Sequence, residues 1–233
     1  MVISRSQIQW CLAMLLCMVA NVAAQDTVNP VQVAGQGPFL ADGTRNSWSD
    51  QNSIVIWTRT TRFPEMLVDG LPFVSLSARE ANALSRSRDP DELLRAQLPD
   101  GATLDQMFGA CPGAAGRVRL SWFPEGSPDE TKRTEWTTTD SESDFTAQWK
   151  LTDLKPGTQY TTIVEAQTTD GQPGASLTGS FRTAPAADVA KPLRFCVTTC
   201  HDFIRRDDDM NGHKIYPTMS HMNPDFLVHA GDI

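Results

Sequence analysis

Residues 154–166 read LKPGTQYTTIVEA, and this stretch decides the fold class. Pro156 and Gly157 favour a turn. From Tyr160 to Ala166, side chains that suit a core recur at every second position, which predicts a half-buried β-strand. A Tyr that opens a strand directly after such a turn is typical of a tyrosine corner, whose hydroxyl bonds back to the backbone in immunoglobulin-like sandwiches. An ordinary turn followed by a core Tyr is the alternative.

The same alternation occurs elsewhere along the chain. The segments are residues 54–59, 117–122, 145–151 and 177–183. Gly, Pro and Asp residues separate them, as expected for turns between antiparallel strands with one buried face. We therefore predict a mainly β fold, an N-terminal immunoglobulin or fibronectin-III-like sandwich over residues 25–186.

One helical insertion should interrupt the sandwich at about residues 64–116. Ser77 with Glu80 and Thr103 with Gln106 both have the spacing of a capping box. Residues 89–92, DPDE, predict a helix with Asp89 as N-cap and a proline in the first turn. The role of the insertion does not follow from its sequence.

Residues 1–24 have the features of a secretory signal peptide. Arg5 precedes an apolar run from Ile8 to Ala20, and Val22-Ala23-Ala24 supplies small residues for cleavage before Gln25. A membrane anchor is the alternative, but the run is shorter than the ~20 residues that a span needs. We expect an exported protein, periplasmic or extracellular, whose mature form has no transmembrane helix.

Composition limits the partners. The formal net charge is −8 and no long basic patch is present, so nucleic acid is a poor candidate. Of five cysteines, two lie in the signal peptide, which leaves Cys111, Cys196 and Cys200. An odd number suggests a thiol with a role other than a disulfide. Cys196 and Cys200 should not pair, because four strand residues span ~13 Å and a disulfide needs Cα atoms within about 7 Å.

The pattern changes after residue 186. Residues 193–199 predict a short strand, residues 214–222 a helix and residues 226–228 an apolar strand. Strand, helix and strand in this order predict the opening βαβ unit of an α/β domain over residues 187–233.

Ligands of such sheets collect at the carboxyl ends of parallel strands, where Cys200 and Asp232 stand. A thiolate and a carboxylate that converge there predict a metal site. The alternatives are a buried cysteine and a turn aspartate. His229 suits either a residue behind the metal ligands or a core histidine, and His213 and His221 suit the surface.

Several segments together resemble the alkaline phosphatase D (PhoD-like) family of exported metallophosphoesterases. They are GSFRTAP at 179–185, LRFCVTTC at 193–200, IYPTM at 215–219, NPDFLVHAGD at 223–232 and, more weakly, IVIWTR at 54–59. The resemblance implies an immunoglobulin-like domain before a four-layer α/β/β/α catalytic domain that hydrolyses phosphomonoesters or phosphodiesters with iron and calcium. It implies that Cys200 binds metal and that Asp232 bridges metals.

Two positions depart from the family pattern. The family often has Gln after the metal-binding Cys and Tyr after Gly-Asp, and His201 and Ile233 stand there. The remaining ligands of the family would lie beyond Ile233. The resemblance therefore leads us to expect an N-terminal fragment, with a truncated catalytic domain, that is inactive by itself.

Two other functions stay open from the sequence. One is a secreted immunoglobulin-like module that binds protein or polysaccharide and carries a non-catalytic tail. The other is a purple-acid-phosphatase-like enzyme, which would want Asp-x-His after the first strand, where Thr199-Cys200-His201 stands. Substrate, metal identities and oligomeric state do not follow from the sequence.

Overall fold

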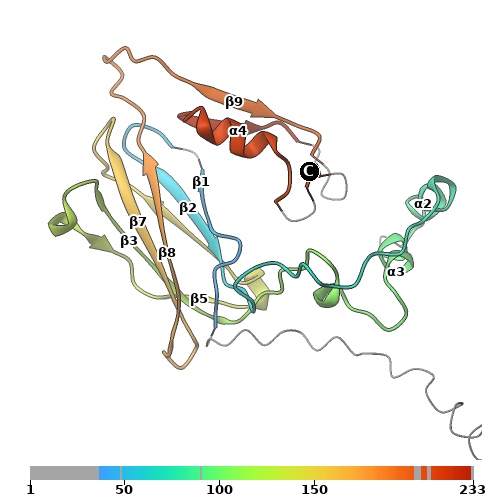
Figure 1. Cartoon of the computed structure of the whole chain (residues 1–233). Helices are drawn as coiled ribbons and strands as arrows, with labels where there is room; N and C mark the ends of the chain where they lie inside the picture. Colours follow the sequence, from blue (N-terminus) through green and yellow to red (C-terminus); the bar gives the residue numbers. More distant parts are fainter. Residues whose placement is uncertain (1–36, 48, 90, 202–205, 209–210, 232–233) are drawn as a thin grey trace, which may run out of the picture. The chain divides into compact units, whose positions relative to one another are not determined.

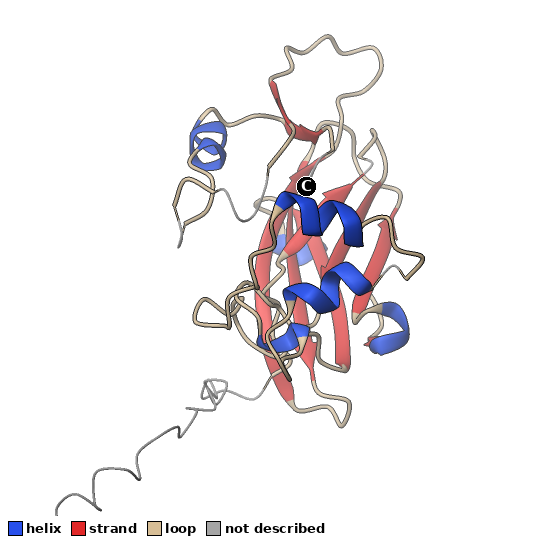
Figure 2. Cartoon of the chain, turned by 90° about the vertical axis from the view of Figure 1, so that its right-hand side faces the viewer, coloured by secondary structure: helices blue, strands red, loops and turns tan. Residues whose placement is uncertain are grey.

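A computed structural model of the chain describes residues 37–47, 49–89, 91–201, 206–208 and 211–231. The predicted signal peptide and Asp232 lie outside these residues. The main part of the fold is built around two antiparallel sheets (Figures 1 and 2). The first has the order β1-β2-β6, with β1 at Thr44–Ser47, β2 at Ile54–Arg59 and β6 at Thr146–Leu151.

The second sheet has the order β4-β3-β7-β8, and β5 also pairs with β3. Its strands are β3 (Gly116–Pro124), β4 (Lys132–Arg133), β5 (Thr137–Thr139), β7 (Gln159–Gln167) and β8 (Pro173–Arg182). One core cluster joins the inner faces of both sheets. In this cluster Ile56 and Trp149 of the first sheet pack with Leu120 and Val164 of the second, which confirms a mainly β sandwich.

The tyrosine corner is confirmed. Tyr160 is buried, and its hydroxyl oxygen accepts a hydrogen bond from the Lys155 backbone N–H at 2.8 Å. The Lys155 carbonyl in turn accepts from the Thr183 hydroxyl at 2.7 Å. The Tyr160 ring stacks on Phe181 with centroids 5.0 Å apart. These contacts fasten the loop before β7 to the end of β8.

Some strand limits differ from the sequence predictions. The alternation placed Phe145 in a strand, but its φ of 58° is left-handed and β6 begins at Thr146. A bulky residue adopts this conformation only where its surroundings hold it. The neighbour that permits it is Gly113, where an added Cβ would lie 1.9 Å from the Phe145 ring. The last strand, β8, begins at Pro173, before the predicted start at residue 177.

The insertion between β2 and β3 is helical in part, as predicted. Its elements are α2 (Ala78–Leu84), α3 (Glu92–Gln97) and a 3₁₀ turn (Leu104–Gln106). Ser77 and Glu80 form the predicted capping box, and the Thr103 backbone N–H donates to Gln106 at 2.9 Å. The predicted N-cap of α3 was wrong: the cap is Asp91, because Asp89 is used in the preceding turn, where its carboxylate accepts from the Asp91 N–H.

The two ends of the insertion are held together by backbone hydrogen bonds. Arg62 N–H donates to the Pro112 carbonyl at 2.8 Å, and Leu67 N–H donates to Ala110 at 2.8 Å. Further out, Leu71 bonds to residues 106 and 108, and Met107 is 1% exposed. We call residues 62–67 with 110–112 the neck of the insertion.

The C-terminal part contains β9 (Phe195–Thr198), α4 (Ile215–His221) and β10 (Phe226–His229). The two strands are parallel, with Phe195 opposite Phe226. The order strand, helix, strand agrees with the sequence prediction, while the assignment to a metallophosphoesterase domain stays a proposal. Of three apolar residues in and next to α4, only Met219 is buried, while Ile215 and Met222 are 44% and 51% exposed.

The apolar strand predicted at residues 226–228 forms β10, but among the described residues little covers its side chains. Phe226, Leu227 and Val228 are each more than 40% exposed.

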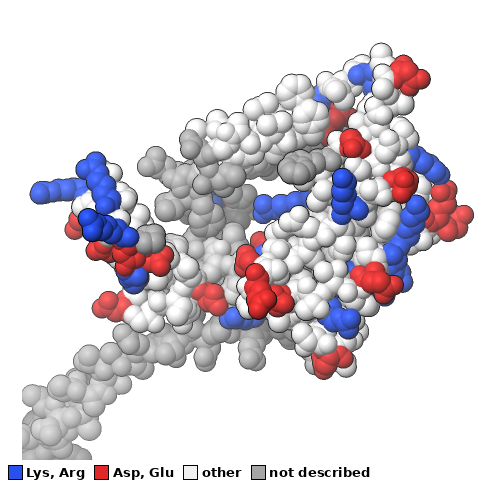
Figure 3. Space-filling model, turned by 180° about the vertical axis from the view of Figure 1, so that it is seen from behind, with Lys and Arg blue, Asp and Glu red and all other residues white. Residues whose placement is uncertain are grey.

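The surface elsewhere is mixed in charge: on the face in Figure 3 the described Lys and Arg side chains alternate with Asp and Glu. No helix within the described residues is both long enough and apolar enough to cross a membrane.

Candidate functional site

The carboxyl ends of β9 and β10 lie side by side. The Ala230 N–H donates to the Thr198 carbonyl at 2.8 Å, and the Cys200 N–H donates to the Gly231 carbonyl at 3.2 Å. The Thr199 hydroxyl also donates to Gly231 at 2.9 Å. These bonds extend the parallel pairing past the strands themselves. They bring Cys200 beside the residue that precedes Asp232.

Cys200 has an unusual backbone for a cysteine. Its φ of 58° is left-handed, which residues with a Cβ rarely adopt. Its side chain is exposed, so burial of a small apolar group does not explain the conformation. Strain of this kind is found at functional sites more often than elsewhere. Cys200 at the carboxyl edge of a parallel pair is therefore a candidate functional residue.

The other cysteine of β9 lies in a different environment. Cys196 is partly buried, is paired in register with Leu227 and is a free thiol. The absence of a Cys196–Cys200 disulfide agrees with the strand geometry. Cys196 thus packs within the sheet, whereas Cys200 follows it.

The donor set for a metal is small within the described part of the chain. No three His, Cys, Asp or Glu side chains there are arranged to hold a metal ion. Cys200 supplies a soft thiolate, which suits iron but not calcium, because calcium takes oxygen ligands. Asp232 would supply the oxygen, and it lies outside the described residues.

Three histidines and a tyrosine gather at this same edge. His201 follows Cys200, His213 precedes α4 and His229 ends β10, while Tyr216 lies on α4. The His201 ring is centred 4.7 Å from that of His213, 5.0 Å from Tyr216 and 5.8 Å from His229. Three of the four histidines of the chain meet here. We call these four residues the His–Tyr cluster.

Hydrogen bonds orient the cluster. His201 Nδ1 lies 2.6 Å from the Tyr216 hydroxyl. The Thr198 hydroxyl lies 3.1 Å from His201 Nε2. The Gly231 N–H donates to His229 Nδ1 at 3.3 Å. Two rings are therefore tied to the strand ends, and His201 is held from two sides.

The sequence prediction missed this cluster in part. His213 was assigned to the surface, yet it is partly buried and stacks on His201. Its position between Gly212 and α4 was the available signal, since residues that precede a crossover helix lie near the edge where the first strand ends. His221 is exposed, as predicted.

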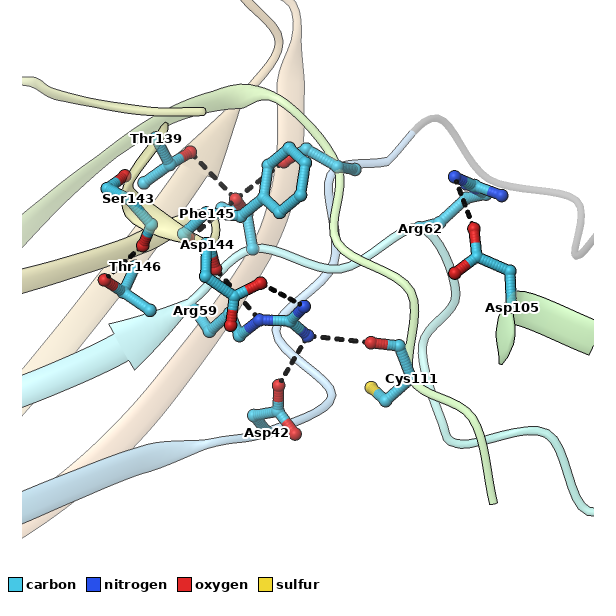
Figure 4. A network of polar contacts seen from close by, with 12 residues as sticks. Asp42, Arg59, Arg62, Asp105, Cys111, Thr139, Ser143, Asp144, Phe145 and Thr146 are labelled. Atoms are coloured by element: carbon cyan, nitrogen blue, oxygen red, sulfur yellow. Dashed lines mark hydrogen bonds and ion pairs between the residues drawn. The ribbon is translucent and has the colours of Figure 1, made fainter. Parts of the chain in front are cut away.

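A second polar network lies in the sandwich, around Arg59 (Figure 4). Its guanidinium donates to Asp42 at 3.2 Å, to the Cys111 carbonyl at 2.7 Å and to the Asp144 carboxylate at 3.0 Å. Although burial opposes it, hydrogen bonding to the two carboxylates raises the pKa of Arg59. Burial, followed by the negative charge of Asp42, raises the pKa of the Cys111 thiol to about 11. This network joins the end of β2 to the segment before β1, to the neck of the insertion and to the turn before β6.

An open hollow is lined by residues 50–53, Lys150, Thr152, Asp153 and Ala184. Of the carboxylates that line the hollow, that of Asp50 accepts the most hydrogen bonds. The backbone N–H groups of Asn52 and Ser53 and the Ser53 hydroxyl bond to it and lower its pKa. The Asp50 carboxylate therefore stabilises the turn in which it lies, and the lining of the hollow is part of an ordered loop.

Comparison with known proteins gives a structural likeness. The chain is similar to a solved structure described as "Structure of PhoD", with 15% identity and a TM-score of 0.50 over 86% of this chain and 29% of that chain. At this identity the likeness concerns the fold alone. This chain spans 29% of the length of that protein.

Two isolated domains are also similar. They are the fibronectin type-III domain of human fibronectin type III domain containing protein 3 (12% identity, TM-score 0.33, 69% of this chain and 99% of that chain) and the same type of domain in human contactin 1 (11%, 0.32, 73% and 99%). These scores are too low to carry an argument. No family model and no curated protein matches the chain.

Proposed function

We propose that this chain belongs to an exported, metal-dependent phosphoesterase that resembles PhoD. The observation that carries the proposal is the edge formed by β9 and β10. There Cys200 is held in a left-handed conformation, exposed, and bonded through its backbone to Gly231. Residue 232, an aspartate, comes next. The structural likeness to PhoD supports the same relation at the level of fold.

In this proposal Cys200 would hold iron, and Asp232 would supply a carboxylate for iron and calcium. Two metal ions that share a carboxylate would stabilise both the attacking and the leaving oxygen of a phosphate ester. A coordinating thiol is deprotonated by its metal, so Cys200 would need no neighbouring base. Phosphomonoesters and phosphodiesters are both suitable substrates for such a site.

The remaining parts of the proposal follow from the sequence. Residues 1–24 would direct export and be removed, so the mature chain would begin near Gln25. N-terminal sequencing of secreted material checks this, and a mature protein that still began at Met1 would refute it.

The first test is to read the coding sequence downstream of Ile233. A phosphoesterase needs further metal ligands, so we expect Asp, Asn and His residues in additional strand-end motifs. A stop codon at once after Ile233 would overturn the proposal and favour a secreted sandwich that serves as a binding module.

The second test uses the complete gene product and two model substrates, p-nitrophenyl phosphate and bis(p-nitrophenyl) phosphate. Cys200→Ser should lower bound iron, because a hydroxyl is a weak replacement for a thiolate. Asp232→Asn should abolish hydrolysis while the sandwich stays folded. Cys196→Ser is the matched control and should keep both metal and rate. Full iron and full rate in Cys200→Ser would show that the wrong residue has been assigned.

A further inference from the structure

The outer face of the second sheet carries positive charge on an acidic chain. Residues of β3 alternate between the core and this face, so Arg117 and Arg119 share it, about 7 Å apart along the strand. Arg133 of β4 lies opposite Ser121 and therefore stands on the same face. The net charge of the whole chain is −8, so three arginines in adjoining rows are a local reversal of sign.

A carboxylate on this face is already neutralised. Glu165 of β7 lies opposite Arg119 and accepts from its Nε at 2.8 Å and from its Nη2 at 3.0 Å. Hydrogen bonding to Arg119 lowers the pKa of Glu165 although burial opposes it, and the positive charge of Arg133 adds to the effect. The Trp136 ring packs on the Arg119 guanidinium, with Cζ 4.4 Å from the ring centroid. Arg119 is thus occupied, and the positive charge that remains belongs to Arg117 and Arg133.

Both of these arginines have donors that no described group uses. Arg133 Nε donates to the Ser121 hydroxyl at 2.9 Å, and within the described part of the chain its two terminal nitrogens have no partner. Arg117 makes no hydrogen bond or ion pair with a described side chain, and its cross-strand neighbours Thr138 and Gln167 are uncharged. Along the strand, the row of Arg133 is about 13 Å from that of Arg117. This separation suits an extended polyanion, with an acidic group at each guanidinium, better than a single small anion.

Strand β8 adds hydroxyl groups to the same face. Ser176, Thr178 and Ser180 lie opposite outward residues of β7 and are exposed. Among the described residues, no group bonds to their hydroxyls. Such hydroxyls both donate and accept, as the hydroxyls of a sugar ring require. Trp136 and Ile163 are only partly exposed, and Arg119 lies over the Trp136 ring, which leaves little apolar area for lipid or for a nucleic acid base.

We propose that the outer face of the second sheet binds an acidic polysaccharide whose sugar rings carry carboxylates. Arg117 and Arg133 pair with carboxylates of the polymer, and the β8 hydroxyls bond to its sugar hydroxyls. Arginine suits this task because its planar guanidinium matches a carboxylate through two parallel hydrogen bonds. The residues of this surface all belong to the sandwich, and the inference does not rest on the phosphoesterase proposal.

The test is a calorimetric titration of the 233-residue chain with an oligogalacturonate, in a buffer that contains chelator and no phosphate ester. We expect saturable binding that weakens as salt is added, because salt screens exposed charges. A neutral oligosaccharide of the same length is the matched ligand and should not bind. Single-stranded DNA and vesicles of anionic phospholipid are the competing polyanions. Binding of either as tight as that of the oligogalacturonate would overturn the inference.

Variants then locate the site. Arg117→Gln and Arg133→Gln should each weaken binding about 10-fold, the loss expected for hydrogen bonds between charged groups. Glu165→Gln should strengthen binding about 3-fold, because a negative charge leaves the face and Arg119 is released. Arg45→Gln is the matched control, since Arg45 is an exposed arginine on β1 of the other sheet. It should bind as the unchanged chain does.

Tryptophan fluorescence in urea reports whether each variant is folded. If Arg133→Gln unfolds because Ser121 loses its donor, Arg117→Gln decides the question, since Arg117 has no described partner to lose. Unchanged affinity in Arg117→Gln, an equal loss in Arg45→Gln, or weaker binding by Glu165→Gln would each overturn the inference. Because the titration contains neither metal nor ester, its outcome is independent of whether the gene product is a phosphoesterase.

Discussion

Removal of one hydroxyl group, by Tyr160→Phe, tests the tyrosine corner. The ring stays, and with it the stacking on Phe181. The lost contact is the 2.8 Å hydrogen bond from the Lys155 N–H. A typical intramolecular hydrogen bond contributes about 1 kcal/mol, and a donor left without a partner adds to the cost. Because Tyr160 is only 4% exposed, we expect a loss of about 1–2 kcal/mol in the free energy of unfolding.

Urea unfolding followed by tryptophan fluorescence measures this loss, with an unchanged m-value as the sign of an unchanged folded state. The matched control is Tyr216→Phe, which removes the hydroxyl of the only other tyrosine. It lies on α4, and the sandwich transition should stay within about 0.5 kcal/mol of the unchanged chain. Equal midpoints for Tyr160→Phe and the unchanged chain would refute the role of the corner.

Three further predictions concern the sandwich and the tail. Arg59→Leu should lower stability by about 2 kcal/mol, because two carboxylates and two carbonyls lose their donor. In the same urea assay, Arg62→Leu should cost less than about 0.5 kcal/mol, because the ion pair of Arg62 with a carboxylate is half exposed. The raised thiol pKa of Cys111 means that the unfolded chain releases this proton first, so stability should fall between pH 9 and about 11, and Cys111→Ala should remove that part of the pH dependence. Amide hydrogen exchange should be slow at Val118, which is 0% exposed, and fast at Phe226, which is 46% exposed. Equal protection of these two amides would contradict an independently folded sandwich.

The sequence predicted those parts of the fold in which a regular residue pattern reflects a single structural role. Alternation identified β2, β3, β6 and β7 because their inner faces fill a single core. The Pro-Gly turn and Tyr160 identified the tyrosine corner, because the residues of this motif lie close together in the sequence. Phe145 continued the alternation of β6, but whether it joins the strand depends on Gly113, which is 32 residues away in sequence.

The candidate site could be predicted only in part. Residues at strand ends follow from the βαβ order. Cys200 was therefore expected at this edge, and its backbone contact with Gly231 agrees with that position, while its role as a metal ligand stays a prediction. Its left-handed backbone carries no sequence signal, since Cys has no preference for that region. The stacking of His213 on His201 depends on how the loop between β9 and α4 returns to the strand end, and loop paths are not encoded in periodicity.

The neck of the insertion has a consequence for how this domain can change over evolution. Its backbone hydrogen bonds close the chain before α2 begins and after the 3₁₀ turn ends. The entropy of loop closure grows only slowly with loop length, by about 0.6 kcal/mol for each doubling. Whatever lies beyond the neck can therefore be lengthened, shortened or exchanged at small cost to the two sheets. The insertion is thus a position at which a lineage could acquire a new binding partner without having to re-evolve the core.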